Sequence, residues 1–342
     1  MEWIFNDWFE YKDELYFFHA LERYSGKYNI KENKFYFVPE IEGTDVIEWG
    51  IDKFFVSEKY AFGVLLNGKG VLKIDMESMK LSIISIEAEI SERGVYACHA
   101  FYNDSIYLFL LDKSEVIILN NVSTDGVTTE NILLDKAYYI GCNQRDKVWL
   151  FPENGNDCIC FDLLEKKYQN IQFDTQFEML LNADCTENGV FVVSRSGQLY
   201  SFDPALHKFE LSVKLPVDAC YHICVADEKI VFLPCYMDKF YTFDINNGSL
   251  SDYGDIPSDI VYNAPKEWVR YYRYASRGGR KFYALRSADY ILVIDEKSGE
   301  ISWIKPSGTD ASSEIAYFTI NGGITRENAD ANAKSLIQYL CS

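Results

Sequence analysis

The feature that most constrains the fold is a strand–turn–strand unit that recurs along almost the whole chain. The most regular copies are LYSFDPALHKFELSVKLP from Leu199, FYTFDINNGSLSDYGDIP from Phe240 and YILVIDEKSGEISWIKP from Tyr290. Each contains an alternating apolar strand that ends in an apolar residue and Asp, then a short polar turn, a second alternating strand and a Pro. Because the unit returns at a nearly fixed period, it indicates one supersecondary element that is copied and packed side by side.

Weaker copies of the unit begin at Lys27, Val71, Val116 and Cys158. The position of the Asp is filled, at intervals of 41 to 51 residues, by Lys31, Asp75, Asn120, Asp162, Asp203, Asp244 and Asp295. One four-stranded propeller blade takes about 40 to 50 residues, and two further candidate strands precede each anchor. We therefore predict an all-β fold over residues 1–323, a seven-bladed β-propeller of four-stranded antiparallel blades.

The anchor acid has a mechanical interpretation. A carboxylate at the end of a strand accepts hydrogen bonds from backbone N–H groups shortly after it and so shapes the turn to the last strand. Gly248 and Gly299 supply a positive φ in the same turn. We expect these acids to be structural.

The pattern resembles the repeat of kelch-type β-propellers, in which an apolar-Asp turn is followed by an aromatic strand and a Pro. The residues that carry this resemblance are Phe202, Asp203, Phe209 and Pro216, and again Phe243, Asp244, Tyr253 and Pro257. The last copy, with Asp295, Gly299 and Trp303, equally resembles the repeat of quinoprotein propellers. The paired glycines of kelch repeats are missing from nearly all copies.

Two elements are expected after Pro306. EIAYFTI, residues 314–320, alternates like a strand, and we predict that it closes the ring on the first blade, whose inner strand would be residues 3 to 9. Residues 324–342 then place Ala329, Ala333, Leu336, Ile337 and Leu340 at helical spacing. They predict a short C-terminal helix packed on the propeller.

Charge and composition exclude some classes of partner. The chain has 33 Lys+Arg against 52 Asp+Glu and a net charge of −19, which disfavours binding to nucleic acid or to a membrane. No signal sequence is visible at the start, and the nine cysteines are an odd number. These features favour a cytoplasmic, monomeric protein with reduced thiols.

Cysteines and histidines recur in the predicted innermost strands. Cys98, Cys142, Cys185 and Cys224 are spread around the expected ring, which favours packing over a metal site, and no cofactor is predicted. His99 and His222 fall on innermost strands and could face a central channel. No nucleophile signature accompanies them.

The segment Tyr262–Ser287 stands out by its charge. It holds seven basic residues against the single acid Glu267: Lys266, Arg270, Arg273, Arg277, Arg280, Lys281 and Arg286. On a strand, Trp268, Arg270, Tyr272 and Tyr274 would share one face, with Tyr271 and Arg273 on the other. Guanidinium groups beside aromatic rings suit a carboxylate, a phosphate or an acidic peptide, but they equally suit internal pairing with the chain's own acids.

Two functions follow from this interpretation. The first is a non-catalytic interaction module that binds a protein partner or an anionic small ligand through its loop faces. The predicted ligand-binding residues are Trp268, Arg270, Tyr272, Arg273, Arg277, His99 and His222. The alternative is a carbohydrate-active enzyme of the kelch-like epimerase or hydrolase type, with its site at the channel mouth.

The anchor role of the turn acids is testable at Asp244. We expect Asp244→Ala to lower the free energy of unfolding by about 1 to 3 kcal/mol, because backbone N–H groups of the turn lose their acceptor. Thermal unfolding measures this, and an unchanged melting temperature would contradict the anchor role.

Overall fold

The computed structural model describes residues 7–18, 25–38, 50–86, 95–187, 189–216, 221–234, 239–255, 257–259, 271–285 and 290–308. In these ranges all regular secondary structure is β, as 28 strands in seven four-stranded antiparallel sheets, which confirms the predicted seven-bladed propeller. No helix in the described ranges is long and apolar enough to cross a membrane. The predicted closing strand (314–320), the predicted helix (324–342) and residues 3–6 lie outside them.

The chain forms two compact units. Unit 1 comprises Met1–Val95, Asp259–Ile294 and Ile301–Ser342, and unit 2 comprises Tyr96–Ser258 and Asp295–Glu300. The sheets are numbered here as blades 1 to 7 in chain order. Blades 1 and 2 and most of blade 7 belong to unit 1, and blades 3 to 6 belong to unit 2.

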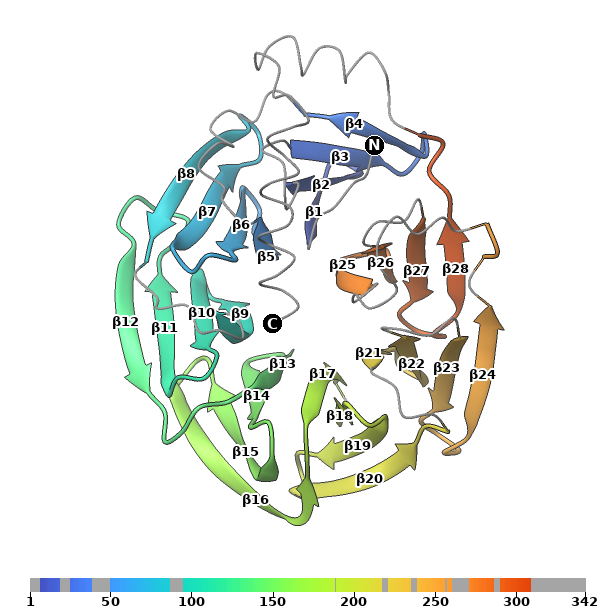
Figure 1. The fold of residues 1–342 in the computed structure, drawn as a ribbon. Coiled ribbons are helices and arrows are strands. Elements are labelled where there is room, and N and C mark those ends of the chain that lie inside the picture. Colours follow the sequence, from blue (N-terminus) through green and yellow to red (C-terminus); the bar gives the residue numbers. More distant parts are fainter. Residues whose placement is uncertain are drawn as a thin grey trace, which may run out of the picture. The chain divides into compact units, whose positions relative to one another are not determined.

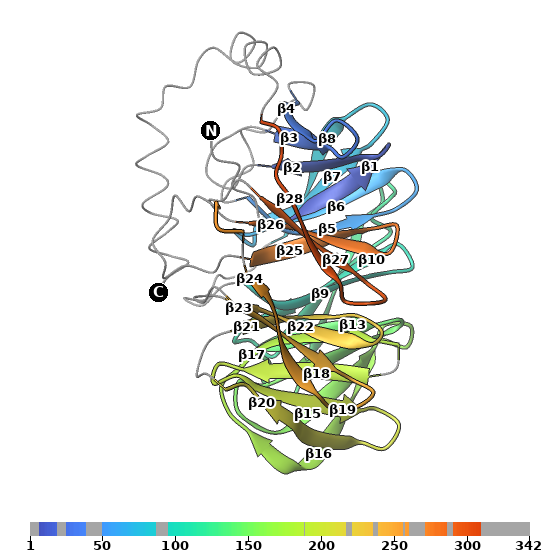
Figure 2. The ribbon, with the colours of Figure 1, turned by 90° about the vertical axis from the view of Figure 1, so that its right-hand side faces the viewer.

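The strands of unit 1 follow one another in the sheet as they do in the chain. Blade 1 contains β1 (Trp8–Tyr11), β2 (Glu14–Phe18), β3 (Ser25–Asn29) and β4 (Lys34–Phe37). Blade 2 contains β5 (Ile51–Val56), β6 (Tyr60–Leu65), β7 (Gly70–Asp75) and β8 (Lys80–Ser85). Blade 7 contains β25 (Tyr271–Arg277), β26 (Arg280–Leu285), β27 (Ile291–Asp295) and β28 (Ile301–Ile304), with β28 nearest the viewer in Figure 2.

The strands of unit 2 have the same order. Blade 3 contains β9 (Tyr96–Tyr102), β10 (Ser105–Leu110), β11 (Glu115–Asn120) and β12 (Thr128–Leu133); blade 4 contains β13 (Ile140–Gln144), β14 (Lys147–Phe151), β15 (Gly155–Asp162) and β16 (Lys167–Phe177). Blade 5 contains β17 (Leu180–Thr186), β18 (Gly189–Ser194), β19 (Gln198–Asp203) and β20 (Lys208–Lys214); blade 6 contains β21 (Tyr221–Val225), β22 (Lys229–Pro234), β23 (Lys239–Asp244) and β24 (Leu250–Asp255).

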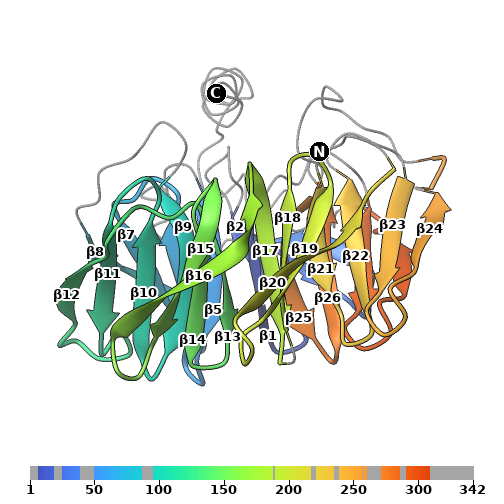
Figure 3. The ribbon, with the colours of Figure 1, turned by 90° about the horizontal axis from the view of Figure 1, so that it is seen from below.

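The first strand of each blade is the innermost one. Within unit 2, β9 contacts β13, β13 contacts β17 and β17 contacts β21; within unit 1, β1 contacts β5 and β25 (Figure 1). Antiparallel pairing puts the first and third turns of a blade at one end, here called the turn side, and its second turn at the other end, the loop side. Figure 3 shows the turn side of unit 2 along the lower rim.

Burial follows the position of a strand in its blade. The second strands β10 and β18 are buried along their whole length. For β18, residues of blade 4 cover one face and residues of blade 6 cover the other. The outermost strands β8 and β12 are exposed at most positions. This explains why the sequence changes from continuous apolar runs to polar alternation within each repeat.

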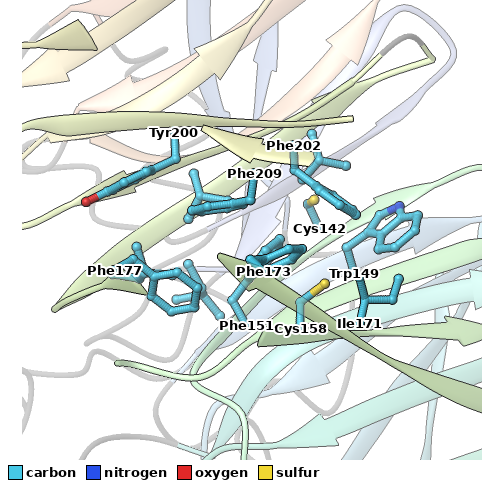
Figure 4. Packing of buried hydrophobic residues seen from close by; sticks show 14 residues of the cluster. Cys142, Trp149, Phe151, Cys158, Ile171, Phe173, Phe177, Tyr200, Phe202 and Phe209 are labelled. Atoms are coloured by element: carbon cyan, nitrogen blue, oxygen red, sulfur yellow. The ribbon is translucent and has the colours of Figure 1, made fainter. Parts of the chain in front are cut away.

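Aromatic rings fill the space between blades 4 and 5 (Figure 4). Phe173 and Phe209 are stacked, with ring centroids 4.8 Å apart, and Trp149 meets Phe202 edge-on at 4.9 Å. All four side chains are buried. Such pairs add about 0.5–1.5 kcal/mol each beyond their buried area, so the aromatic content of the sequence serves inter-blade packing.

The anchor acids act as predicted in five blades. Asp203 Oδ1 accepts the N–H groups of Ala205 (2.8 Å) and Leu206 (3.1 Å). The same two-residue and three-residue hydrogen bonds are made by Asp75, Asp162, Asp244 and Asp295.

The anchor assigned to the first copy was wrong, and that of the third copy ends β11 as predicted but does not make the turn hydrogen bonds. In blade 1 the anchor is Asn29, whose Oδ1 accepts the N–H groups of Lys31 and Glu32, both at 3.0 Å. In blade 3, Asn120 Oδ1 accepts Ser105 Oγ at 3.1 Å, and Asp104 accepts the Ser123 N–H at 3.1 Å instead. An amide or a neighbouring carboxylate therefore replaces the Asp where the repeat is degenerate.

The inner strand of blade 1 is β1, Trp8–Tyr11, and not residues 3 to 9 as predicted. The four described strands of the blade are consecutive in the chain, and the predicted addition of residues 314–320 lies outside the described residues. The segment that follows β28 lies along β4: Ser307 N donates to Asn33 O at 2.7 Å, and Phe35 N donates to Gly308 O at 3.1 Å. These bonds satisfy part of the outer edge of blade 1.

The reassignment of the blade 1 anchor from Lys31 to Asn29 can be tested by one substitution at each position. We expect Asn29→Ala to lower the free energy of unfolding by about 1–2 kcal/mol through its lost hydrogen bonds, and Lys31→Ala to stay within about 0.5 kcal/mol because its side chain is exposed. Urea unfolding measures both. Equal losses for the two variants would refute the assignment.

Candidate functional site

The predicted basic site falls on blade 7 and is described in part. Trp268 and Arg270 lie outside the described residues. Tyr272, Arg273 and Arg277 belong to β25, the innermost strand of that blade, of which the backbone is described. The site is therefore built from the β25–β26 hairpin.

The hairpin ends in a tight turn with an arginine on each side. Arg277 lies directly opposite Arg280, and the two residues between them, Gly278 and Gly279, have φ of 55° and 74°. Two consecutive positive φ values are typical of a type I′ turn, which glycine adopts without steric cost. A Cβ at either glycine would meet nothing within 4 Å, so the tip of the hairpin is open.

Strict alternation does not hold along β25. The register with β26 shifts between Tyr271 and Tyr274, so three steps on β25 match two on β26. The prediction that Tyr272 and Tyr274 share a face with Trp268 and Arg270 assumed an unbroken period of two; the pairing is irregular at Tyr272, and Trp268 and Arg270 lie outside the described residues, so it stays a prediction. Such bulges re-aim the residues around them.

Arg280 is exposed and has no ion pair within the ranges the structure describes. The described ion pairs of unit 1 use lysines instead, such as Lys27 with Glu14 (2.8 Å) and Lys53 with Asp7 (3.5 Å). Like charges directly opposite one another in a sheet are destabilising. The register of the hairpin backbone places Arg277 and Arg280 at such opposite positions.

A cluster that the sequence analysis missed lies at the loop side of blade 7. Asp259 accepts the Tyr290 hydroxyl at 2.6 Å and the Lys305 ammonium at 2.8 Å, and Lys305 Nζ lies 5.0 Å from the centre of the Tyr290 ring. Lys305, and after it the Tyr290 hydroxyl, lowers the pKa of Asp259. The hydrogen bond to Asp259 raises the pKa of Tyr290. This carboxylate is thus engaged by partners other than the arginines of the hairpin.

The two histidines are not brought together. His99 on β9 is buried, with its ring 4.8 Å from that of Tyr96, whereas His222 is half-buried on β21. β13 and β17 lie between these strands in unit 2. The enzyme alternative had required these side chains to converge.

The thiols of unit 2 join neighbouring innermost strands. Cys185 Sγ donates to Asn143 O at 2.7 Å, and Cys98 Sγ donates to Asn143 Oδ1 at 3.6 Å. Contact with the Cys185 thiol, and then burial, raises the pKa of Cys142, so this thiol stays protonated. In the described part of the chain, no group of three or more His, Cys, Asp or Glu side chains could hold a metal ion.

Comparisons with known proteins support the fold alone. No protein-family model and no curated protein matches the chain. A catalytically inactive variant of virginiamycin B lyase from Staphylococcus aureus with quinupristin has a TM-score of 0.60 at 11% identity, over 84% of this chain and 92% of the lyase.

Two further solved structures have a similar fold. PorZ, a surface component of the type-IX secretion system of Porphyromonas gingivalis, has a TM-score of 0.60 at 8% identity and matches over 89% of this chain but 38% of PorZ. The computationally designed protein Ika8 has a TM-score of 0.57 at 10% identity, over 88% of this chain and 86% of Ika8. At these identities the likeness identifies a β-propeller and carries no activity with it.

The Asp259 cluster predicts a pH effect. Because the folded-state pKa of Asp259 lies below its unfolded value, its contribution to stability is present above the unfolded pKa and is lost as the pH falls through the folded pKa. We expect Lys305→Met to raise the pKa of Asp259 toward its ordinary value and to make stability less sensitive to acid. NMR titration of the carboxyl carbons measures the pKa, with Lys208→Met, which removes an exposed pair with Glu210, as the control. An Asp259 pKa that does not move in Lys305→Met would disprove the assignment.

Proposed function

We propose that this β-propeller is a non-catalytic interaction module that captures a protein partner or a small ligand by an anionic group. The β25–β26 hairpin of blade 7 is its binding site. The observation that carries the proposal is the arginine pair across the Gly278-Gly279 turn, with Arg280 exposed and without an ion pair in the described ranges. Arginine suits this role because its planar fork of donors matches carboxylate and phosphate oxygens.

The distribution of charge also supports a binding site for an anion in unit 1, which contains the β25–β26 hairpin. Unit 2 has 27 acidic and 12 basic residues, a net charge of −15, whereas unit 1 has 25 acidic and 21 basic residues, a net charge of −4. An anionic ligand is therefore repelled far less by unit 1. Seven of the basic residues of unit 1 belong to the segment Tyr262–Ser287.

The type of propeller repeat and the location of the protein are also proposals. The turn acids and the aromatic fourth strands support a kelch-like or quinoprotein-like origin of the repeat. Reduced thiols, such as those of Cys98 and Cys158, support a cytoplasmic location, where they are maintained.

The binding test uses two probes, inorganic phosphate and a labelled hexaglutamate peptide. We expect the unmodified protein to bind at least one of them and the Arg277→Ala, Arg280→Ala variant to bind at least tenfold more weakly, a change of about 1.4 kcal/mol. Calorimetry and fluorescence anisotropy measure the affinities. Arg145→Ala is the matched control, because Arg145 also lies at a hairpin turn but pairs with Glu187 at 2.6 Å.

Stability provides the second measurement of the same prediction. Removing one charge of a like-charged cross-strand pair should stabilise the free protein, so we expect Arg280→Thr to raise the free energy of unfolding by about 0.2–1 kcal/mol while it weakens binding. If Arg280→Thr destabilises the protein, or if the double variant binds both probes as the unmodified protein does, the hairpin is structural and the proposal is wrong.

A further inference from the structure

We propose a second binding site on the loop side of unit 2, formed by Arg195, Met179 and Tyr139 and here called the Arg195 site. It would bind a partner segment that has a carboxylate next to an apolar side chain. None of these residues belongs to the basic segment of blade 7. The inference is independent of the proposed function, because it rests on other residues in the other unit.

Three hydrogen-bonded chain segments hold the Arg195 site in place. Met179, between β16 and β17, donates its N–H to Asn154 Oδ1 at 2.7 Å, and its carbonyl accepts the Arg195 N–H at 2.9 Å. Leu180 N donates to Glu153 O at 3.0 Å in the same place. The loop β14–β15, the connection β16–β17 and the loop β18–β19 are thus hydrogen-bonded to one another. A surface held in this way loses little conformational freedom when a partner binds.

Met179 has a backbone conformation that its side chain does not favour. Its φ is 50°, in the left-handed region where Gly or Asn would be less strained, and its side chain is 47% exposed. Burial in the core therefore does not explain the choice of methionine at this position. An exposed thioether packs adaptably against many apolar surfaces.

Arg195 supplies the polar half of the Arg195 site. Its Nη2 donates to the Tyr139 hydroxyl oxygen at 3.2 Å, and it has no ion pair in the described stretches of this acidic chain. The guanidinium is exposed and carries several further donors. Tyr and Arg are the residue types most enriched where single side chains dominate a protein interface.

The class of ligand follows from the residues in and around the Arg195 site. The guanidinium selects a carboxylate, and the adjacent methionine selects an aliphatic or aromatic side chain next to it. The exposed Glu178 and the net charge of −15 on unit 2 oppose an extended acidic partner. A short segment with one acid next to an apolar residue fits both conditions, because contact at Arg195 acts at close range and the remaining charge is screened.

The test begins with a phage library of random 12-residue peptides. Peptides are selected on the unmodified protein after depletion on Arg195→Gln, and the enriched ones are then synthesised. We expect them to carry Asp or Glu next to Leu, Ile, Met or Phe, and to bind at least tenfold more weakly to Arg195→Gln and to Met179→Gly. Fluorescence anisotropy measures the affinities.

Stability distinguishes a binding role of Met179 from a structural one. Met179→Gly relieves the left-handed strain, so its melting temperature should equal or exceed that of the unmodified protein although the peptides are lost. His207→Gly is the matched control, because His207 is also exposed with a φ of 51°; it should leave peptide binding unchanged.

Several outcomes would overturn the inference. These are the enrichment of no peptide over Arg195→Gln, enriched peptides without a carboxylate, and a Met179→Gly variant that binds as tightly as the unmodified protein. If Arg277→Ala, Arg280→Ala loses the peptides while Arg195→Gln keeps them, the peptides occupy the blade 7 hairpin. In that case this inference fails and the proposed function stands.

Discussion

The innermost strand of each blade pairs with only one neighbour in its sheet, and the rest of the architecture depends on how its second edge is satisfied. At β5 and β21, short polar side chains of the preceding blade do this. Asp7 Oδ2 accepts the Phe54 N–H at 2.6 Å in unit 1, and Asp184 Oδ2 accepts the Val225 N–H at 2.8 Å in unit 2. Asn182 Oδ1 binds the Ile223 N–H at 3.0 Å in the same way. Sheets that share no ladder are thus joined by bonds from side chain to backbone, next to the aromatic packing farther out.

This constraint determines which polar groups are available for function. Asn143 donates to His99 O at 2.6 Å while its own oxygen atoms accept the thiols of Cys98 and Cys185. A side chain that holds two blades together is costly to replace, because its loss would leave backbone groups unsatisfied. The turns and loops at the ends of the blades are less constrained by this task.

Most of the fold could be predicted because its signals are local. An Asp that accepts N–H groups two and three residues later needs no distant partner, so the turn acids identified the period and with it the blades. The errors have physical causes too. Asn29 makes the same bonds as Asp but breaks the pattern, so the turn residue of blade 1 was assigned wrongly. The register shift in β25 arises in its pairing with β26 and has no signal in the residues of β25 alone. The Asp259–Tyr290–Lys305 cluster and the left-handed Met179 have no sequence signature, because only the folded chain brings their partners together.

A difference between the lysines and the arginines in their ion pairing connects these observations. Lysines make most of the ion pairs among the described residues, including Lys27, Lys59, Lys166 and Lys305, and they also cover tyrosine rings. Arg145 is paired with Glu187, whereas Arg195 and Arg280 are exposed and have no acid partner there. Both of these arginines lie at short turns, and the Arg195 backbone is hydrogen-bonded to Met179 of a neighbouring segment. Rigid presentation of an uncompensated guanidinium has little use for folding, but it is what recognition of a carboxylate or a phosphate requires.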